Sequence, residues 1–279
     1  MTGQPALPAH IVRILTALLE SRTGQQLAAY RSWRLDTALK PLLKQRKLAT
    51  FDDLVSLLLH DHDPLIADQV IDALVNGETS FFRDAPVFDL VAQAVAMVEA
   101  QGRRARIWCA GCATGQEPLS LAMLFADRAG GGTMPEIVAT DVSEGALVRA
   151  RAGRYTQFEA QRGLPIRRLM QWFDGAPDGD WIARPELVRN IQYRRANLVA
   201  DPAPPGRFDV VMCRNVLLYL SPQVKPTVFD RIAGALRPDG LFAMGAGETV
   251  IGQTTLFVPS RHIRGLYDPV APGSATMAA

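Results

Sequence analysis

The sequence is poor in the residues that mark several classes of protein. Its 279 residues include three cysteines, an odd number that argues against a disulfide framework and favours a reducing compartment. Its apolar runs are much shorter than the roughly 20 residues that a membrane-spanning helix needs. The first ten residues lack the basic-then-apolar pattern of a secretory signal. We therefore expect a cytoplasmic protein that does not insert into a membrane.

Net charge and metal ligands are scarce as well. The formal net charge is +2, so bulk charge does not predict binding to nucleic acid. His60 and His62 are two residues apart and would not share a helix face, while His10 and His262 are isolated. Hydrophobic residues make up 48% and charged residues 21%, values typical of a globular protein. We expect a monomer with no metal ion and no nucleic-acid partner.

The most informative stretch runs from Ile107 to Met123, with the sequence IWCAGCATGQEPLSLAM. An apolar run stops at Gly111, a turn of small residues continues to Gly115, and Glu117 then opens a segment with helical apolar spacing. This order predicts a buried strand, a tight turn and a helix, which together form the first βα unit of a doubly wound sheet. Open sheets of this kind bind ligands at the carboxyl ends of their strands.

The residues of the turn leave more than one ligand open. A dinucleotide site needs G-x-G-x-x-G, whereas Gly111 and Gly115 are separated by three residues and a carboxylate at Glu117 would repel a pyrophosphate. That carboxylate suits a cationic ligand such as S-adenosylmethionine (AdoMet), which carries a sulfonium and an ammonium. The sequence from Trp108 to Cys112 is also similar to a thioredoxin-type W-C-x-x-C redox motif. A glycine turn without any ligand is a further alternative.

Helical patterns fill the chain before this strand. Residues 8–21 have apolar residues at i, i+3, i+4, i+7 and i+8, and residues 25–48 form a second helical stretch that contains a proline. No strand signal precedes residue 104. We therefore predict a small all-helical N-terminal domain over residues 1–83.

The remaining chain, residues 84–279, predicts a Rossmann-like α/β domain with alternating strands and helices. The alternation breaks at about residues 153–196. There a turn at residues 175–180, GAPDGD, separates short apolar segments. We interpret this part as a small β-hairpin insertion.

The second helical stretch is the most basic part of the chain. It contains three of the four lysines, at i, i+4 and i+7, and a single acid, Asp36. A solvated helix face is one interpretation, and a docking face for an acidic partner is the other. The basic residues are Arg31, Arg34, Lys40, Lys44, Arg46 and Lys47.

Polar residues follow several predicted strands. Asp141 ends the second strand, where an acid can accept both hydroxyls of a ribose. A role as helix N-cap is the weaker interpretation, because Ser143 can cap the next helix by itself. Arg214 and Asn215 end a later buried strand. These side chains are expected at the same edge of the sheet.

A further polar cluster surrounds two phenylalanines just before the first predicted helix of the α/β domain. It contains Glu78, Thr79 and Arg83. Arg83 is a fixed cation whose planar fork matches a carboxylate, such as the one at the methionyl end of AdoMet.

Taken together, these residues resemble the chemotaxis receptor methyltransferase (CheR) family over about residues 10–270. The family transfers a methyl group from AdoMet to the γ-carboxylate of particular glutamates in the cytoplasmic helices of chemoreceptors. The products are a glutamate methyl ester and S-adenosyl-L-homocysteine. The resemblance rests on five motifs in this order: ETSFFR at 78–83, AGCATGQEP at 110–118, ATD at 139–141, NL at 197–198 and CRNVLLY at 213–219.

The resemblance also implies roles for individual residues. Tyr219 is expected near the transferred methyl group, and Arg106 is expected to assist the substrate. The basic stretch 31–47 corresponds to the face that docks on the receptor helices. The expected AdoMet contacts are Thr79, Arg83, Gly111, Glu117, Asp141, Asn197, Leu198, Arg214 and Asn215.

Two other functions stay open at this stage. One is an AdoMet-dependent methyltransferase that acts on a small molecule or on RNA. The other is a signalling module that binds AdoMet without turnover. The chain also departs from many relatives at Gly77, Gln116 and Leu119.

Overall fold

The computed structural model describes residues 7–27, 33–60, 64–128 and 133–270. The chain divides into two compact units, residues 1–76 with 219–222 and residues 77–218 with 223–279. The boundary therefore lies between Asn76 and Gly77 and not after residue 83. Phe81 explains the difference, because its buried ring packs against Tyr155 and Phe173 of the second unit at centroid distances of 5.0 and 5.6 Å.

The first unit is helical, as the apolar spacing predicts. Gly24 ends the first helix in a left-handed conformation, with φ 71°. Thr50 and Asp53 exchange hydrogen bonds of 3.1 and 2.8 Å at the start of the third helix, which is a capping box. The helices are α1 (Ala9–Thr23), α2 (Trp33–Arg46), α3 (Phe51–His60) and α4 (Pro64–Leu74).

Residues 219–222 belong to the helical unit through backbone pairing with the end of α1. The N–H of Gln26 donates to the carbonyl of Tyr219 at 2.7 Å, and the N–H of Ser221 donates to the carbonyl of Gly24 at 2.9 Å. Pro41 lies inside α2, so the helix continues through the proline. The core of this unit is aliphatic and includes Ile11, Leu15, Leu39, Leu42, Leu54, Ile66 and Val70.

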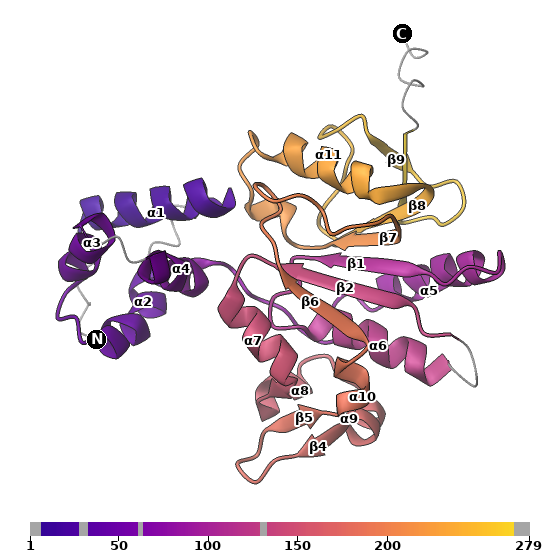
Figure 1. The fold of residues 1–279 in the computed structure, drawn as a ribbon, viewed down its shortest axis with the longest axis horizontal. Helices are drawn as coiled ribbons and strands as arrows, with labels where there is room; N and C mark the ends of the chain where they lie inside the picture. Colours follow the sequence, from indigo (N-terminus) through magenta and orange to yellow (C-terminus); the bar gives the residue numbers. More distant parts are fainter. Residues whose placement is uncertain (1–6, 28–32, 61–63, 129–132, 271–279) are drawn as a thin grey trace. The chain divides into compact units, whose positions relative to one another are not determined.

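The second unit contains a seven-stranded sheet in the order β6-β2-β1-β7-β8-β10-β9 (Figure 1). The first five strands of this order are parallel and the last two are antiparallel. The strand order reverses beside β1, which is the switch point where doubly wound sheets bind ligands. The strands are β1 (Arg106–Ala110), β2 (Glu136–Asp141), β6 (Ile191–Arg195), β7 (Phe208–Cys213), β8 (Leu236–Met244), β9 (Phe257–Pro259) and β10 (Tyr267–Pro269).

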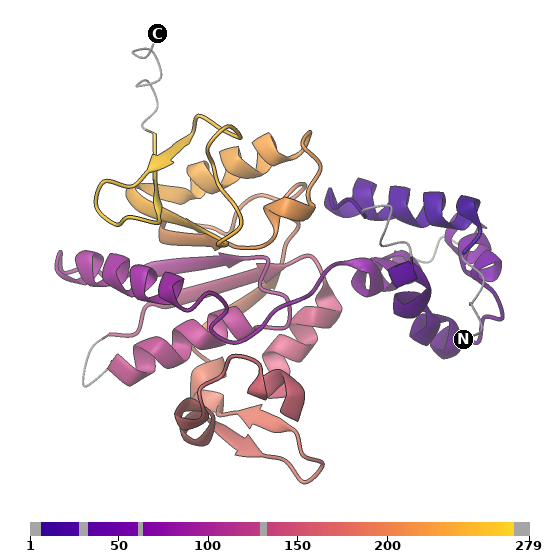
Figure 2. The ribbon, with the colours of Figure 1, turned by 180° about the vertical axis from the view of Figure 1, so that it is seen from behind.

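Helices pack on this sheet and bury its central strands. Every residue of β7 is buried, as expected for a parallel strand that is covered on both faces. Figure 2 shows α5 and α6 in front of the strands. On α11, Phe229 packs near Phe242 of β8, with ring centroids 6.5 Å apart. The helices are α5 (Pro86–Glu99), α6 (Gln116–Arg128), α7 (Glu144–Ala152) and α11 (Lys225–Ala235).

The insertion is a three-stranded antiparallel sheet in the order β3-β5-β4, which has one strand more than the predicted hairpin. The predicted range of 153–196 also extends too far, because β6 pairs with β2 and belongs to the main sheet. The elements of the insertion are β3 (Arg154–Tyr155), α8 (Gln157–Gln161), α9 (Ile166–Trp172), β4 (Phe173–Gly175), β5 (Trp181–Ala183) and α10 (Pro185–Val188). Among the helices that the structure describes, none is long and apolar enough to span a bilayer.

Candidate functional site

The turn after β1 needs glycine at both of its ends. Gly111 and Gly115 have φ values of +84° and +91°, in the left-handed region that side chains avoid. A Cβ at Gly111 would lie 2.5 Å from Cγ2 of Val216, and a Cβ at Gly115 would lie 2.8 Å from Cβ of Ala150. The turn is therefore a tight cradle of backbone at the carboxyl end of the central strand.

Asp141 ties this cradle to the end of the neighbouring strand β2. Its carboxylate accepts the N–H of Ala113 at 2.7 Å on one oxygen and the N–H of Ser143 at 2.9 Å on the other. The hydroxyl of Ser143 accepts the N–H of Ala146 at 3.0 Å and caps α7. Ser143 thus supplies the cap, which leaves Asp141 as the acid at the strand end.

Arg214 joins three segments of the chain at the carboxyl end of β7. One amino group of its guanidinium lies 2.9 Å from the carboxylate of Glu117, at the start of α6. The other lies 2.9 Å from Asp84 and 2.6 Å from the carbonyl of Arg83. Arg214 is 6% exposed, and its Nε has no hydrogen-bond partner among the described residues. Arg214 and Glu117 therefore place a buried cation and a largely buried anion directly beside the turn.

The environment of Glu117 makes its charge sensitive to what binds nearby. Burial raises the pKa of this carboxyl group, while the guanidinium of Arg214, a hydrogen bond with Cys109 and the charge of Arg83 lower it. Burial is the largest influence and the net shift is upward. A cationic ligand beside Glu117 would favour its ionised form.

The backbone around Arg83 is held in an uncommon conformation. Phe82 and Asp84, on either side of it, have positive φ values of 46° and 53°. Non-glycine residues rarely adopt this region, and such strain concentrates at functional sites. The N–H of Phe82 donates to the hydroxyl of Ser120 on α6 at 3.0 Å, and the side chain of Arg83 donates to the carbonyl of Glu78 at 3.2 Å. The segment is thus fastened to the helix that carries Glu117.

The other predicted contacts also lie at strand ends or beside the turn. Thr79 lines a cavity of about 390 Å³ together with Thr114 and Gln116 of the turn and the start of α6. Asn197 follows β6, and its side chain accepts the N–H of Val199 at 2.9 Å. The carbonyl of the next residue, Leu198, accepts a hydrogen bond from Arg231. Asn215 follows Arg214 in a left-handed conformation, with φ 56°. The parallel strands therefore bring these residues to one edge of the sheet.

Arg106 is not at this edge, which corrects the prediction that it assists the substrate. It is the first residue of β1, so the length of the strand separates it from Gly111. Its guanidinium pairs with Glu136 at 2.7 Å and lies over the ring of Phe208 at 4.7 Å. It also donates to the carbonyl of Arg207 at 3.1 Å. Arg106 links the amino ends of neighbouring strands, and its side chain does not lie at the carboxyl edge.

Tyr219 ends a short 3₁₀ helix, Leu217–Tyr219, four residues after Asn215 in the chain. By its contacts it belongs to the helical unit, where it accepts the hydrogen bond from Gln26. Its predicted role near the methyl group therefore stays a prediction.

The basic residues of the second helical stretch differ in their surroundings. Arg31 lies outside the described residues, and so does the side chain of Arg34. Arg46 donates to Gln69 at 2.8 Å, which fastens α2 to α4. Lys40, Lys44 and Lys47 are exposed, although Lys40 also pairs with Asp36 at 2.7 Å. The three lysines make up what we call the α2 basic face.

Glu248 also lies beside the predicted site, and the sequence reasoning missed it. It follows β8 by a few residues, and its carboxylate accepts the N–H of Asn215 at 2.6 Å. The signal was present, because an acid just after a buried strand is the same feature that identified Asp141. Asp84 was missed as well, although it pairs with Arg214 at 2.9 Å.

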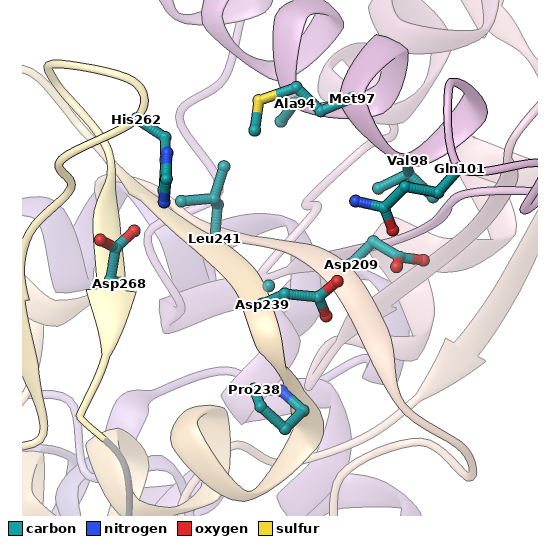
Figure 3. A pocket seen from close by; sticks show the side chains of 11 residues that line it. Ala94, Met97, Val98, Gln101, Asp209, Pro238, Asp239, Leu241, His262 and Asp268 are labelled. Carbon is teal, nitrogen blue, oxygen red and sulfur yellow. The ribbon is translucent and has the colours of Figure 1, made fainter.

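A second cavity, of about 310 Å³, lies towards the amino ends of β7 and β8 (Figure 3). Its lining includes Met97 of α5 and Gln101 just after that helix, together with Asp209, Asp239 and His262. The buried carboxylate of Asp209 is already neutralised, because Arg103 lies 2.5 Å and Arg237 lies 3.3 Å from it. This end of the sheet thus pairs its charges within the fold.

The redox interpretation of the turn does not fit the structure. Cys109, Cys112 and Cys213 are free and buried. Burial raises the pKa of all three thiols well above the ordinary value. They are therefore protonated at neutral pH, whereas redox-active cysteines are partly exposed and have a lowered pKa.

The site has the chemistry that AdoMet requires. The glycine cradle admits a ligand close to the backbone, Glu117 offers a carboxylate to a cation, and Asp141 offers one to a ribose. Fold and site together define an AdoMet-binding methyltransferase domain of the Rossmann-like class.

Comparison with known proteins narrows this class. Residues 77–264 match the family model described as "CheR methyltransferase, SAM binding domain". The chain is 34% identical over 245 residues to "Chemotaxis protein methyltransferase 1" of Pseudomonas aeruginosa, covering 85% of this chain and 89% of that protein. It is 34% identical over 250 residues to a "Chemotaxis protein methyltransferase" of Vibrio parahaemolyticus, covering 88% and 91%. The Escherichia coli protein of that name is 30% identical over 255 residues, covering 89% and 87%.

The chain therefore belongs to the CheR methyltransferase family. The predictions of the family, of the fold class and of AdoMet as cofactor are confirmed. The matched segment begins at residue 77, which is also where the second unit of the structure begins.

Proposed function

We propose that the chain methylates the γ-carboxylate of specific glutamates in the cytoplasmic helices of chemoreceptors. Family membership supports a chemotaxis methyltransferase, and the observation that supports the chemistry is the meeting of Glu117, Asp141 and Arg214 at one sheet edge. Such receptors would place the enzyme in the cytoplasm. The glutamate acceptor and the receptor partner are the parts of this proposal that need a direct test.

The reaction needs neither a covalent intermediate on the protein nor a general base from it. Bound AdoMet supplies a methyl group on a sulfonium, which is a good leaving group. A glutamate with an ordinary pKa of about 4.3 is ionised at neutral pH, so its attack needs no general base. The residues of the chain have to orient the two reactants and exclude water. Orientation of this kind can lower a barrier by up to roughly 7–11 kcal/mol.

The site residues then divide by the part of the reactants that they hold. Asp141 would accept the ribose hydroxyls, Glu117 would face the ammonium group, and Arg83 would pair with the methionyl carboxylate. Tyr219 would position the carboxylate of the acceptor. The remaining proposed AdoMet contacts are Thr79, Gly111, Asn197, Leu198, Arg214 and Asn215.

The α2 basic face is the proposed docking surface for the receptor. The other face of α2 is apolar and buried, through Leu35 and Leu39 among others. Lys40 and Lys44 thus project from a helix whose packing does not depend on them, and Lys47 directly follows the last residue of this helix. Exposed positive charge increases the rate of association with an acidic partner, and this effect weakens as salt screens it.

Methyl transfer to receptor membranes tests the proposal. Membranes with and without chemoreceptors are incubated with the enzyme and radiolabelled AdoMet and then treated with alkali. Receptor-dependent label that is released as methanol identifies a carboxyl methyl ester. Label that resists alkali, or that enters a small molecule or RNA, would show that the methyl acceptor is not a glutamate. Binding of AdoMet without any transfer would indicate a module without turnover.

The same assay tests docking. Lys44→Ala removes an exposed charge of the α2 basic face, and Lys225→Ala is the matched control on the other unit. We expect Lys44→Ala to raise the KM for receptor about two- to fivefold at low salt, less at high salt, and to leave AdoMet affinity unchanged. Equal effects of the two variants would contradict docking at α2.

A further inference from the structure

The carboxylate of Glu248 accepts hydrogen bonds from three backbone N–H groups. One oxygen accepts the N–H of Asn215 at 2.6 Å and the N–H of Gly245 at 3.0 Å. The other accepts the N–H of Leu218 at 3.2 Å. These donors follow the last residues of β7 and β8, beyond the reach of the sheet's own ladder. Glu248 therefore replaces strand pairing at the point where the two strands separate.

The three hydrogen bonds to Glu248, which we call the clamp, hold the backbone next to a residue in the left-handed conformation. Asn215 has a φ of 56°, a region that few residues other than glycine and asparagine adopt readily. The residue before it is Arg214, whose buried guanidinium pairs with Glu117. A shift of the backbone at Asn215 would therefore move both residues that β7 contributes to the site.

Gly245 shows how closely the clamp is packed. A Cβ added at this glycine would lie 2.7 Å from the side-chain nitrogen of Asn215 and 2.8 Å from the carboxylate of Glu248. The amide of Asn215 is thus seated against the backbone of Gly245. No side chain larger than hydrogen fits at residue 245 without displacing either the amide or the carboxylate.

We propose that Glu248 is a positioning residue for AdoMet binding. Its carboxylate holds the backbone of residues 215–218 so that Asn215 faces the cofactor and the short helix that leads to Tyr219 begins in the right direction. The inference rests on the proposed contact between Asn215 and AdoMet. It does not rest on the identity of the methyl acceptor.

The carboxylate cannot be replaced by an amide without loss. Three N–H donors share two negatively charged oxygens, and hydrogen bonds to a charged acceptor are the strong ones. Glutamine offers one oxygen, and its NH₂ group would have to face either the N–H of Leu218 or those of Asn215 and Gly245. Two donors in contact repel, so the backbone must move.

Glu248→Gln is therefore the first variant, and its affinity for AdoMet is measured by calorimetry in the absence of any acceptor. We expect the Kd to rise about tenfold with a binding stoichiometry near one, which shows that the protein is folded. Glu136→Gln is the matched control, because Glu136 is also partly buried in the same sheet but lies at the amino ends of the strands. Its Kd should match that of the unchanged protein.

Gly245→Ala tests the same clamp while the carboxylate is kept. The added methyl group should displace the amide of Asn215 and raise the Kd for AdoMet by a similar factor. A loss of fold alone would lower the stoichiometry and leave the Kd of the folded fraction unchanged. Kd values within twofold of the unchanged protein for both variants would overturn the proposal. Failure of methyl transfer to receptors, with the Kd changes as expected, would instead overturn the proposed acceptor.

Discussion

Arginine–carboxylate pairs lie at both edges of the main sheet, but their surroundings differ. At the amino edge Arg103 and Arg237 surround Asp209, and these groups neutralise one another within the fold. At the carboxyl edge the buried Arg214 pairs with Glu117 and Asp84 directly beside the glycine turn. The two edges therefore differ in where the charges lie: only the second set lies beside the glycine turn.

The backbone shows the same contrast. Of the five non-glycine residues with positive φ in the described part of the chain, four lie beside the carboxyl edge: Phe82, Asp84, Ala113 and Asn215. Each is next to, or is itself, a residue of the site. Positive φ values at non-glycine residues cluster at binding and catalytic sites. Their distribution therefore supports a site at the carboxyl edge.

The largest expected effect comes from removing the acid at the end of β2. Asp141→Ala would remove the proposed acceptor of the ribose hydroxyls, and it would leave the N–H groups of Ala113 and Ser143 without their partner. Each hydrogen bond to a charged group contributes about 1.5–3 kcal/mol, so two of them correspond to at least about a 100-fold rise in the Kd for AdoMet. Calorimetry measures the Kd. A change below tenfold would remove Asp141 from the site.

The next largest effect should appear at the amino edge and in stability alone. Asp209→Asn removes a charge that is almost completely buried and leaves Arg103 and Arg237 without their shared partner. The two arginines that remain are partly exposed and Arg103 also pairs with Asp239, so the loss should be about 1–3 kcal/mol of the free energy of unfolding. Denaturant titration should show this loss while the Kd for AdoMet of the folded protein stays unchanged. A large rise in the Kd would mean that the two edges are coupled.

A smaller effect is expected from pH. Burial raises the pKa of Glu117, so this carboxyl group takes up a proton in the folded protein before it would in the unfolded chain. The contribution of Glu117 to the free energy of unfolding therefore increases as the pH falls from above its raised pKa towards the ordinary pKa of a glutamate. AdoMet affinity should fall over the same range, because the proposed contact between Glu117 and the ammonium group of AdoMet requires an ionised carboxylate. Calorimetry between about pH 7.5 and about pH 5 measures this change in the Kd for AdoMet.

Glu117→Gln is the control for this pH dependence. The variant should bind AdoMet more weakly at neutral pH and show a flatter affinity profile, since the titrating group is gone. A profile that keeps its slope in the variant would assign the effect to another group.

The smallest effect is expected for Arg106→Gln. Its guanidinium pairs with Glu136, and both side chains are partly exposed, so the loss should be about 1 kcal/mol of stability or less. Methyl transfer and the Kd for AdoMet should not change, because Arg106 lies at the amino edge. A loss of kcat in the folded variant would restore the role first predicted for Arg106 and contradict the division between the edges.

Prediction from sequence succeeded where the signal was local. The strand before Gly111, the turn of small residues and the helix after Glu117 follow directly from neighbouring residues, and so does the cap at Ser143. It failed where partners are distant in the chain. The β6 strand was assigned in part to the insertion, because nothing near Ile191 shows that it pairs with β2.

The sequence by itself determined the helical and α/β regions, the glycine turn and the acids that follow strands, because each depends on spacing within a short segment. Only the tertiary structure decided which edge a residue occupies. Arg106 and Arg214 both flank buried strands, but strand direction sends one to each edge. It also showed that Glu248 clamps Asn215, a contact between residues 33 positions apart. Such contacts depend on the sheet order, which no local pattern specifies.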